Sequence, residues 1–272
     1  MPRSSEVALV AFLLGASAAA GAPAKPASAL ALAHLSYVER RAELSSPRGW
    51  HDAKEGTAIR LGDGLRTGET LARLELPWMT MTLSPNSAVR FPDDYLLSVV
   101  LDQGRLQLRA DKREILKVVT GEAQVRGQGW AVVRREGHVT LVTALAGRFL
   151  VEGAGRNVTL PPRTGTIVRE GKPPLSPLAL PEPPEGLMPG SDPRYVAPGD
   201  TISLSWMGTR SAYQVEVLPV GSDDVLIQRD VGAPPWRLTV AWPGAFRWRV
   251  ASRDARGLEG EPSADGLFCV DK

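Results

Sequence analysis

Apolar and polar residues alternate in short runs through residues 50–171. In each run every second residue is apolar, which is the two-residue period of a strand with one buried face. The runs are Thr57–Leu61, Leu71–Leu76, Ser87–Phe91, Arg105–Ala110 and Trp130–Arg134. They recur at a spacing of about ten residues, with breaks that contain Gly or Asp. This spacing predicts an all-β domain, either a β-sandwich or a solenoid-like stack of β-turns.

The last part of the chain, residues 199–272, has a similar alternation. We expect six strands there, at Thr201–Trp206, Tyr213–Leu218, Val225–Asp230, Trp236–Trp242, Phe246–Val250 and Leu267–Val270. Phe246, Trp248 and Val250 fall on one face of their strand, and Arg247 and Arg249 on the other. The number and length of these strands are typical of an immunoglobulin-like sandwich.

Two segments of different composition divide the chain. Residues 173–198 contain a cluster of prolines, which favours an extended and semi-rigid linker. Residues 25–49 begin with an Ala/Pro-rich stretch, for which we expect a tether and a lead-in. The predicted domains are therefore residues 50–172 and residues 199–272.

The first 24 residues have the features of a secretory signal peptide. Arg3 precedes the apolar segment Val7–Ala20, which ends in three alanines. This segment is shorter than the roughly 20 residues that span a membrane, so we expect a protein that is periplasmic or otherwise exported, with cleavage after Ala20 or Ala24. An uncleaved membrane anchor stays open as an alternative. No Cys stands directly after the apolar segment, so a lipid anchor is not expected.

Composition restricts the chemistry that the chain can carry. A single Cys, Cys269, excludes a disulfide framework and a multi-Cys metal site, and the three His lie far apart in the sequence. No hydrolase or metalloprotease motif is present. We therefore predict no enzyme, with no catalytic, cofactor-binding or metal-binding residues. Cys269 is predicted either as a small buried residue or as an outward thiol.

Aspartates and glycines in the predicted breaks have a structural interpretation. Asp63, Asp93, Asp94 and Asp102 do not form a calcium-loop array, so we expect solvated turn carboxylates. The stretch Gly62–Gly68 lacks the spacing of a phosphate-binding loop and is predicted to be a turn.

Charge is distributed unevenly between the two parts of the chain. Residues 25–172 hold 22 basic and 16 acidic residues, a net charge of +6, whereas residues 173–272 hold 9 and 13, a net charge of −4. The candidate basic patch, which could bind an anionic envelope polymer, consists of Arg105, Arg109, Lys112, Arg113 and Lys117. A solvated charged face is the alternative. Nucleic acid is not expected as a partner, because acidic residues interrupt the basic ones and the compartment is wrong.

Three segments of the first predicted domain share motifs with one known family. Gly62-Asp63-Gly64-Leu65-Arg66-Thr67-Gly68 leads into the strand Ala72–Leu76, and Leu83-Ser84-Pro85-Asn86-Ser87-Ala88-Val89 follows. A third segment runs from Val118 to Val151, with closing Leu160 and Gly165. Residues 50–171 resemble the FecR domain, an exported β-rich module. The first motif is similar to the family's "GD-x-hydrophobic-x-TG" stretch.

The carboxyl-terminal part is similar to a second family. It combines Trp206 with the stretch Pro243–Val250 and with Asp254-Ala255-Arg256-Gly257. These residues resemble the "G-x-Y-x-W-R-V … D-x-x-G" pattern of fibronectin type III modules. FecR regulators hold a sigma factor through a cytoplasmic domain, and only six residues precede the apolar segment here. The resemblance therefore implies a non-catalytic binding or signalling-adaptor protein of the cell envelope without an anti-sigma domain. Its expected partner is a membrane-bound signalling or envelope protein, and binding of peptidoglycan or polysaccharide is the alternative.

Overall fold

The computed structural model describes residues 31–46, 49–93, 98–110 and 116–271. Within these ranges the chain is all-β: 24 strands and connecting turns, with no helix. The predicted signal peptide lies outside the described residues. Among the residues described, no helix has the length and apolar character needed to cross a membrane.

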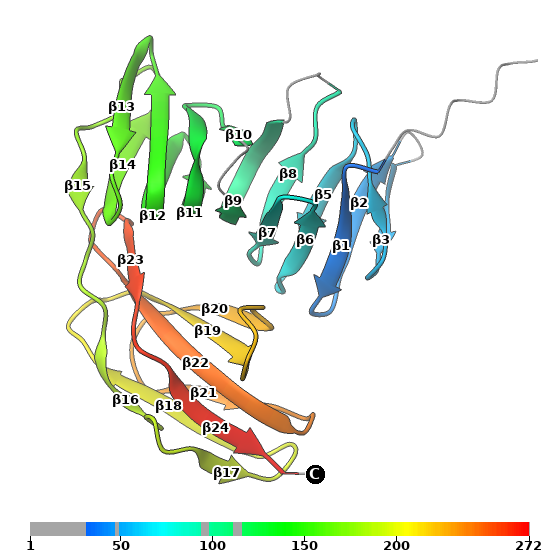
Figure 1. Ribbon diagram of the computed structural model, residues 1–272, viewed down its shortest axis with the longest axis vertical. Coiled ribbons are helices and arrows are strands. Elements are labelled where there is room, and N and C mark those ends of the chain that lie inside the picture. The colour runs from blue at the N-terminus through cyan, green and yellow to red at the C-terminus, as the bar shows by residue number, and fades with distance from the viewer. Residues whose placement is uncertain (1–30, 47–48, 94–97, 111–115, 272) are drawn as a thin grey trace, which may run out of the picture.

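Fourteen strands build the first domain, which carries residues 33–169 (Figure 1). They are β1 (Ala33–Val38), β2 (Ala42–Ser46), β3 (Gly49–Ala53), β4 (Ala58–Ile59), β5 (Gly64–Thr67), β6 (Ala72–Leu76), β7 (Met79–Leu83), β8 (Ala88–Arg90), β9 (Ser98–Ala110), β10 (Leu116–Val119), β11 (Gln124–Glu136), β12 (Val139–Gly153), β13 (Arg156–Leu160) and β14 (Thr164–Arg169). They pair into one continuous network that folds into two layers.

The layers are joined because three long strands contribute to both of them. The first layer runs β4-β1-β6-β7 and continues through the second half of β9, the second half of β11, the first half of β12 and β14. The second layer runs β3-β2-β5-β8 and continues through the other halves of β9, β11 and β12, together with β10 and β13. The arrangement is a sandwich whose two sheets share strands.

A glycine stands where each long strand passes from one layer to the other. Gly104, Gly129 and Gly147 all have positive φ, of 87°, 115° and 83°. Gly129 and Gly147 are opposite each other in β11 and β12. A Cβ on Gly147 would lie 2.0 Å from the carbonyl oxygen of Gln128, so no larger residue fits without displacing the backbone.

The core of the first domain lies between the two layers. Alternate residues of every strand point into it: Leu74, Met81 and Val133 from the first layer, and Leu101 and Val151 from the second, are all fully buried. The other residues of each strand point outward. Each layer therefore presents one outward face, and the two faces lie on opposite sides of the domain.

The second domain is a smaller sandwich. A three-stranded sheet, β16-β18-β21, packs on a six-stranded sheet, in which β17, β24, β22, β19 and β20 follow in that order and β23 pairs with β22. The strands are β16 (Glu185–Met188), β17 (Arg194–Val196), β18 (Thr201–Met207), β19 (Tyr213–Pro219), β20 (Ile227–Val231), β21 (Trp236–Thr239), β22 (Gly244–Arg253), β23 (Glu259–Pro262) and β24 (Gly266–Val270). Trp206, Tyr213 and Trp248 meet in its core, with Phe246 stacked on Phe268.

Two of the predicted boundaries need correction. The lead-in 25–49 contains β1, β2 and the start of β3, and β1 pairs with β6, so the first domain begins near residue 33 rather than residue 50. Ala33 and Leu35 of β1 are buried in the core, which explains why this segment belongs to the domain.

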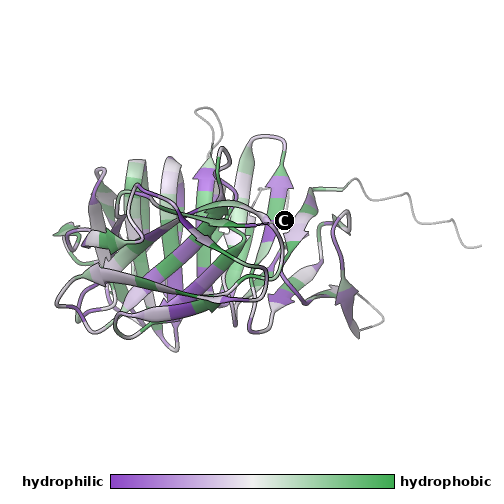
Figure 2. Ribbon diagram, turned by 90° about the horizontal axis from the view of Figure 1, so that it is seen from below, coloured by the Kyte–Doolittle hydropathy of each residue, from purple (hydrophilic) through white to green (hydrophobic). Residues whose placement is uncertain are grey.

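The proline-rich segment 173–198 is held against both domains. Its first strand, β15 (Leu178–Ala179), pairs with β14, and β16 and β17 belong to the second domain. The predicted linker is therefore a segment whose strands are parts of both domains. Figure 2, seen from below, shows the strands of the second domain crossing those of the first, with the first domain extending beyond them.

Candidate functional site

The outward face of the first layer is covered by the second domain. We call it the docked face, made by Arg73, Thr82, Arg105, Gln107, Arg109 and Arg134. Thr82, Arg105 and Gln107 are at most 5% exposed although they point away from the core. The opposing surface is the outward side of β19, β20 and β22, where Gln214, Glu216, Gln228, Arg249 and Arg253 alternate with core residues. Polar and charged side chains predominate on both surfaces, with Trp130 and Leu145 of the first domain lying beside Glu216 and Arg249.

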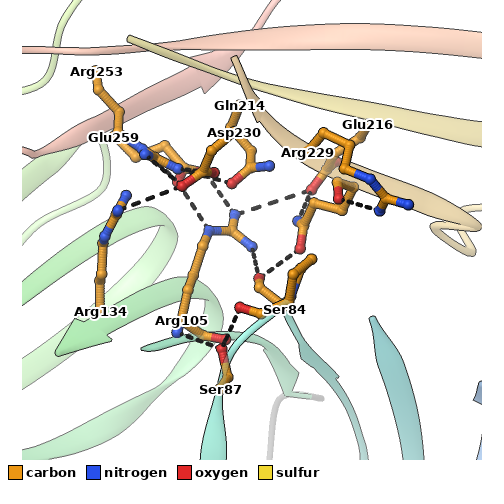
Figure 3. A network of polar contacts seen from close by, with 12 residues as sticks. Ser84, Ser87, Arg105, Arg134, Gln214, Glu216, Arg229, Asp230, Arg253 and Glu259 are labelled. Carbon is orange, nitrogen blue, oxygen red and sulfur yellow. Dashed lines mark hydrogen bonds and ion pairs between the residues drawn. The ribbon is translucent and has the colours of Figure 1, made fainter. Parts of the chain in front are cut away.

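Arg105 is the centre of an ion network at this interface (Figure 3). It extends from β9, and its guanidinium donates two hydrogen bonds to Glu259 of β23, from Nε over 2.9 Å and from Nη2 over 2.6 Å. It also donates to Ser84 Oγ and to Gln107 Oε1, each over 3.0 Å. The side chains of Arg105 and Glu259 are 5% and 7% exposed. This bidentate pair is thus a buried, directional bond between the domains.

A second branch runs from Ser84 into the second domain. Ser84 Oγ donates to Gln228 Oε1 over 2.5 Å, and Gln228 Nε2 donates to Glu216 Oε1 over 2.8 Å. Glu216 also accepts two hydrogen bonds from Arg249, over 2.8 and 2.7 Å. Burial alone would raise the pKa of Glu216, but Arg249 and Arg105 hold this pKa below its usual value. Glu216 is therefore charged at neutral pH.

Asp230 of β20 joins the network at its exposed edge. It pairs with Arg253 within the second domain and lies 3.5 Å from Arg134 of the first. Burial raises the pKa of Asp230, but the hydrogen bonds and positive charge of Arg253 more than offset this and leave the pKa lowered. Glu216 and Asp230 therefore stay ionised at neutral pH, as pairing with arginines requires.

Ion pairs across the interface have a consistent polarity. Among the described residues, seven ion pairs join the domains, and in six of them the first domain supplies the cation: Arg73–Asp224, Arg105–Glu216, Arg105–Glu259, Arg109–Asp223, Arg134–Asp230 and Arg163–Glu261, with Arg229–Glu39 as the reverse. The opposite net charges of the two parts of the chain thus attract the two domains to each other.

Small apolar contacts flank the ionic centre on both sides. Leu71 packs against Leu218 and Val225 at one end. Leu141 and Ile167 pack against Leu258 at the other. These contacts exclude water from the ends of the interface and strengthen the charge pairs between them.

A cleft of about 500 Å³ opens beside the network, at the boundary between the domains. Its lining includes Arg134, Arg135, Arg229, Glu69 and Asp230, so charges of both signs surround it. Arg135 is held by two hydrogen bonds to Glu122, and Arg229 pairs with Glu39. The arginines that line the cleft are therefore engaged by carboxylates, and the cleft is a part of the interface.

The predicted basic patch is divided by the fold. Arg105 is buried in the ion network and Arg109 pairs with Asp223 on the docked face, so these two residues are not available to a polymer. Lys117 lies on the opposite side of the domain, because β10 belongs to the second layer. Lys112 and Arg113 lie outside the described residues. The prediction of one patch is wrong for Arg105 and Arg109.

Other sequence predictions can be placed as well. Asp63 Oδ2 accepts a hydrogen bond from the Arg60 amide over 2.7 Å, and Gly62 has positive φ, as expected of a turn. Asp102 accepts two hydrogen bonds from Arg90. Cys269 is partly exposed, because Phe268 and Val270 beside it take the core positions of β24.

Sequence reasoning missed Glu216, Glu259 and Asp230 as partners of the arginines. The alternation of β22 assigned Arg247 and Arg249 to an outward face, and the opposite net charges were visible. Together these two observations could have indicated that the basic and acidic surfaces of one chain meet.

Comparisons with known proteins give distant structural similarities. No protein-family model matches the chain, and no curated protein sequence does either. Two crystal structures of a protein described as a "putative anti-sigma factor" from Parabacteroides distasonis have TM-scores of 0.36 at 19% and 18% identity. They cover 40% and 41% of this chain, which spans little more than half of theirs, 56% and 57%.

A crystal structure of three titin domains has a TM-score of 0.28 at 13% identity, over 85% of this chain and 88% of that one. Because these TM-scores are low, the similar structures do not contribute to the interpretation of the site, which rests on the contacts within this chain.

Proposed function

We propose that the chain is an exported, non-catalytic binding protein of the cell envelope that acts as a signalling or assembly adaptor. The observation that carries this proposal is the buried ion network centred on Arg105. It holds two sandwich domains as one body, so that a partner bound to either domain is held in a fixed orientation to the other. The signal-peptide pattern of residues 1–24 and the FecR resemblance of residues 50–171 support the envelope location.

Fixed orientation is useful to an adaptor. The charged groups of the interface are paired with each other and are not free to bind a partner. The surfaces left to partners are the outward face of the second layer and the three-stranded sheet of the second domain. An adaptor of this kind is expected to bind a membrane-bound signalling or envelope protein through surfaces on both domains.

Crosslinking in intact cells tests the proposal. The full chain is recovered after crosslinking, and the mature amino terminus is sequenced on the same sample. We expect one defined membrane protein in stoichiometric amount, and a mature chain that starts after Ala20 or Ala24. We also expect the Arg105→Glu variant, which places a fourth carboxylate beside Glu216, Asp230 and Glu259, to lose this partner. The control, Arg163→Ala, removes an exposed pair and should retain it.

Two results would overturn the proposal. Recovery of wall fragments alone, with no stoichiometric protein, would exclude an adaptor. Capture of the same protein by the Arg105→Glu variant, in amounts equal to the wild type, would show that fixed domain orientation has no role in binding.

A further inference from the structure

The outward face of the second layer carries a group of cations that have no acidic partner. We call it the outer face, made by Lys117 of β10, Gln124, Arg126 and Gln128 of β11, Arg148, Leu150 and Glu152 of β12, and Asn157 and Thr159 of β13. Val118, Val125 and Phe149, which alternate with these residues, are at most 3% exposed in the core. The outer face therefore points to solvent, away from the second domain.

Three cations lie close together on this face. Lys117 is directly opposite Arg126 across the β10–β11 pair. Arg126 is opposite Leu150, and Gln128 is opposite Arg148, so Arg148 is a diagonal neighbour of Arg126. Neighbouring strands are about 4.8 Å apart, and directly opposite side chains point to the same side. Three positive charges thus occupy neighbouring positions, with the carboxylate of Glu152 at the other diagonal position of Arg126 and outside ion-pair distance of it.

No carboxylate pairs with Lys117, Arg126 or Arg148 within the described part of the chain. The polar contact of Arg126 is with an amide, Gln124 Oε1, over 3.4 Å. Like charges placed directly opposite each other destabilise a sheet. The docked face of the same domain pairs its arginines with carboxylates, so the outer face departs from the pattern of this chain.

Uncharged polar groups surround the cations. Gln128 and Asn157 are exposed amides, and Thr159 is an exposed hydroxyl, so the face offers hydrogen-bond donors and acceptors between its positive charges. A ligand that carries hydroxyl groups and regularly spaced anions would match both kinds of group. An anionic membrane would need apolar anchors, and Leu150 is the half-buried apolar side chain beside the cations.

We propose that the outer face binds an anionic polysaccharide, with Lys117, Arg126 and Arg148 contacting its acidic groups and the amides and hydroxyl contacting its sugar hydroxyls. The adaptor proposal leaves the same face to a partner, but polysaccharide binding there does not require the ion network of the docked face, which lies on the opposite side of the domain, so the two proposals can fail separately. The proposed polymer site differs from the patch predicted from the sequence. It keeps Lys117 and adds Arg126 and Arg148, which the sequence analysis did not identify.

Isothermal titration calorimetry of the full chain with polygalacturonate tests the proposal. We expect binding that weakens as salt increases, and roughly a tenfold or greater loss of affinity for the triple variant Lys117→Glu, Arg126→Glu, Arg148→Glu. The matched control is Arg169→Glu, Arg194→Glu, Arg237→Glu, which makes the same change in net charge at exposed arginines elsewhere. It should keep most of the affinity. Circular dichroism verifies that both variants fold.

Neutral substitutions distinguish sugar recognition from simple charge attraction. Gln128→Ala combined with Asn157→Ala should weaken binding of polygalacturonate and leave the net charge unchanged. Dextran, which carries no anions, should not bind. Two outcomes would contradict the proposal: equal loss in the triple variant and its control, or tighter binding to phosphatidylglycerol vesicles or polyglutamate than to polygalacturonate.

Discussion

The two outward faces of the first domain carry similar residues and have opposite surroundings. On the docked face, Arg105 and Arg109 of β9 alternate with core leucines and each meets a carboxylate of the second domain. On the outer face, Lys117 and Arg126 alternate with core valines and meet no carboxylate among the described residues. The strand pattern is the same on both sides. The difference shows that topology, rather than local sequence, decides whether a cation is paired with a carboxylate of the other domain.

Breaking the docked face at its centre should have the largest effect. Arg105→Met leaves Glu259 and Glu216 buried with less positive charge, and removal of one partner from a buried ion pair costs about 3–5 kcal/mol. Urea unfolding measures the change in the free energy of unfolding. The double variant Arg105→Met, Glu259→Leu should recover part of the loss, because it removes both charges. A loss below about 1 kcal/mol for Arg105→Met would contradict a buried network.

Acid should weaken the docked face through its carboxylates. Hydrogen bonds from Arg247 and the charge of Arg109 lower the pKa of Asp223, and the pKa values of Glu216 and Asp230 are also lowered. A lowered carboxylate pKa in the folded state adds stability above the unfolded pKa of about 4, and this stability is lost as the pH falls further.

The urea midpoint of the wild type should therefore be steady from about pH 8 to pH 5 and fall below about pH 4. Because Arg105→Met lacks one cation of the network, its midpoint should fall less over the same range. An equal fall in both proteins would show that the acid response comes from elsewhere in the molecule.

The glycine bends determine which half of each long strand contributes to which face. Gly147→Ala should cost about 2–4 kcal/mol, because the new Cβ would meet a carbonyl oxygen at 2.0 Å and φ is positive. Gly155→Ala is the control. It also has positive φ, but no atom lies within 4 Å of its Cβ, so it should cost about 1 kcal/mol. Equal losses would indicate that backbone strain alone, without the close approach of β11, explains the bend.

Changing one cation on the outer face should have a small effect of the opposite sign. Lys117→Glu replaces a like-charge pair with an opposite-charge pair facing Arg126, which should stabilise the fold by about 0.2–1 kcal/mol. The same variant should bind polygalacturonate more weakly. A destabilised variant would mean that Lys117 has a structural partner. The outer face would then resemble the docked face, whose cations stabilise the fold.

Much of the local structure could be predicted from the sequence. The alternation of Phe246, Trp248 and Val250 gave the buried side of β22, and the outward placement of Arg249 was also correct. The all-β class is confirmed. The packing of the first domain on Arg249 could not be predicted. Strand alternation defines the two sides of a strand, but it does not tell which distant segment packs on each side.

The start of the first domain was missed for a different reason. In β1, Ala33 and Leu35 alternate with His34 and Ser36, but this run follows an Ala/Pro-rich stretch whose composition suggested a tether. Small alanines carry a weak hydrophobic signal, and their burial depends on pairing with β6, which lies far along the chain. Pairing between distant segments also separates Lys117 from Arg105, which is close to it in sequence: Arg105 is in the half of β9 that belongs to the first layer, and Lys117 is in β10 of the second layer.

The central claim is that the ion network fixes the second domain on the first. Pulsed electron spin resonance tests it most directly, with spin labels on Glu75→Cys in β6 and Arg237→Cys in β21, both exposed, in a Cys269→Ser background. A fixed arrangement predicts one narrow distance distribution that is the same at low and high salt, and a broader one when Arg105→Met is added. A broad distribution in the protein with native Arg105, or one that widens with salt, would contradict the claim.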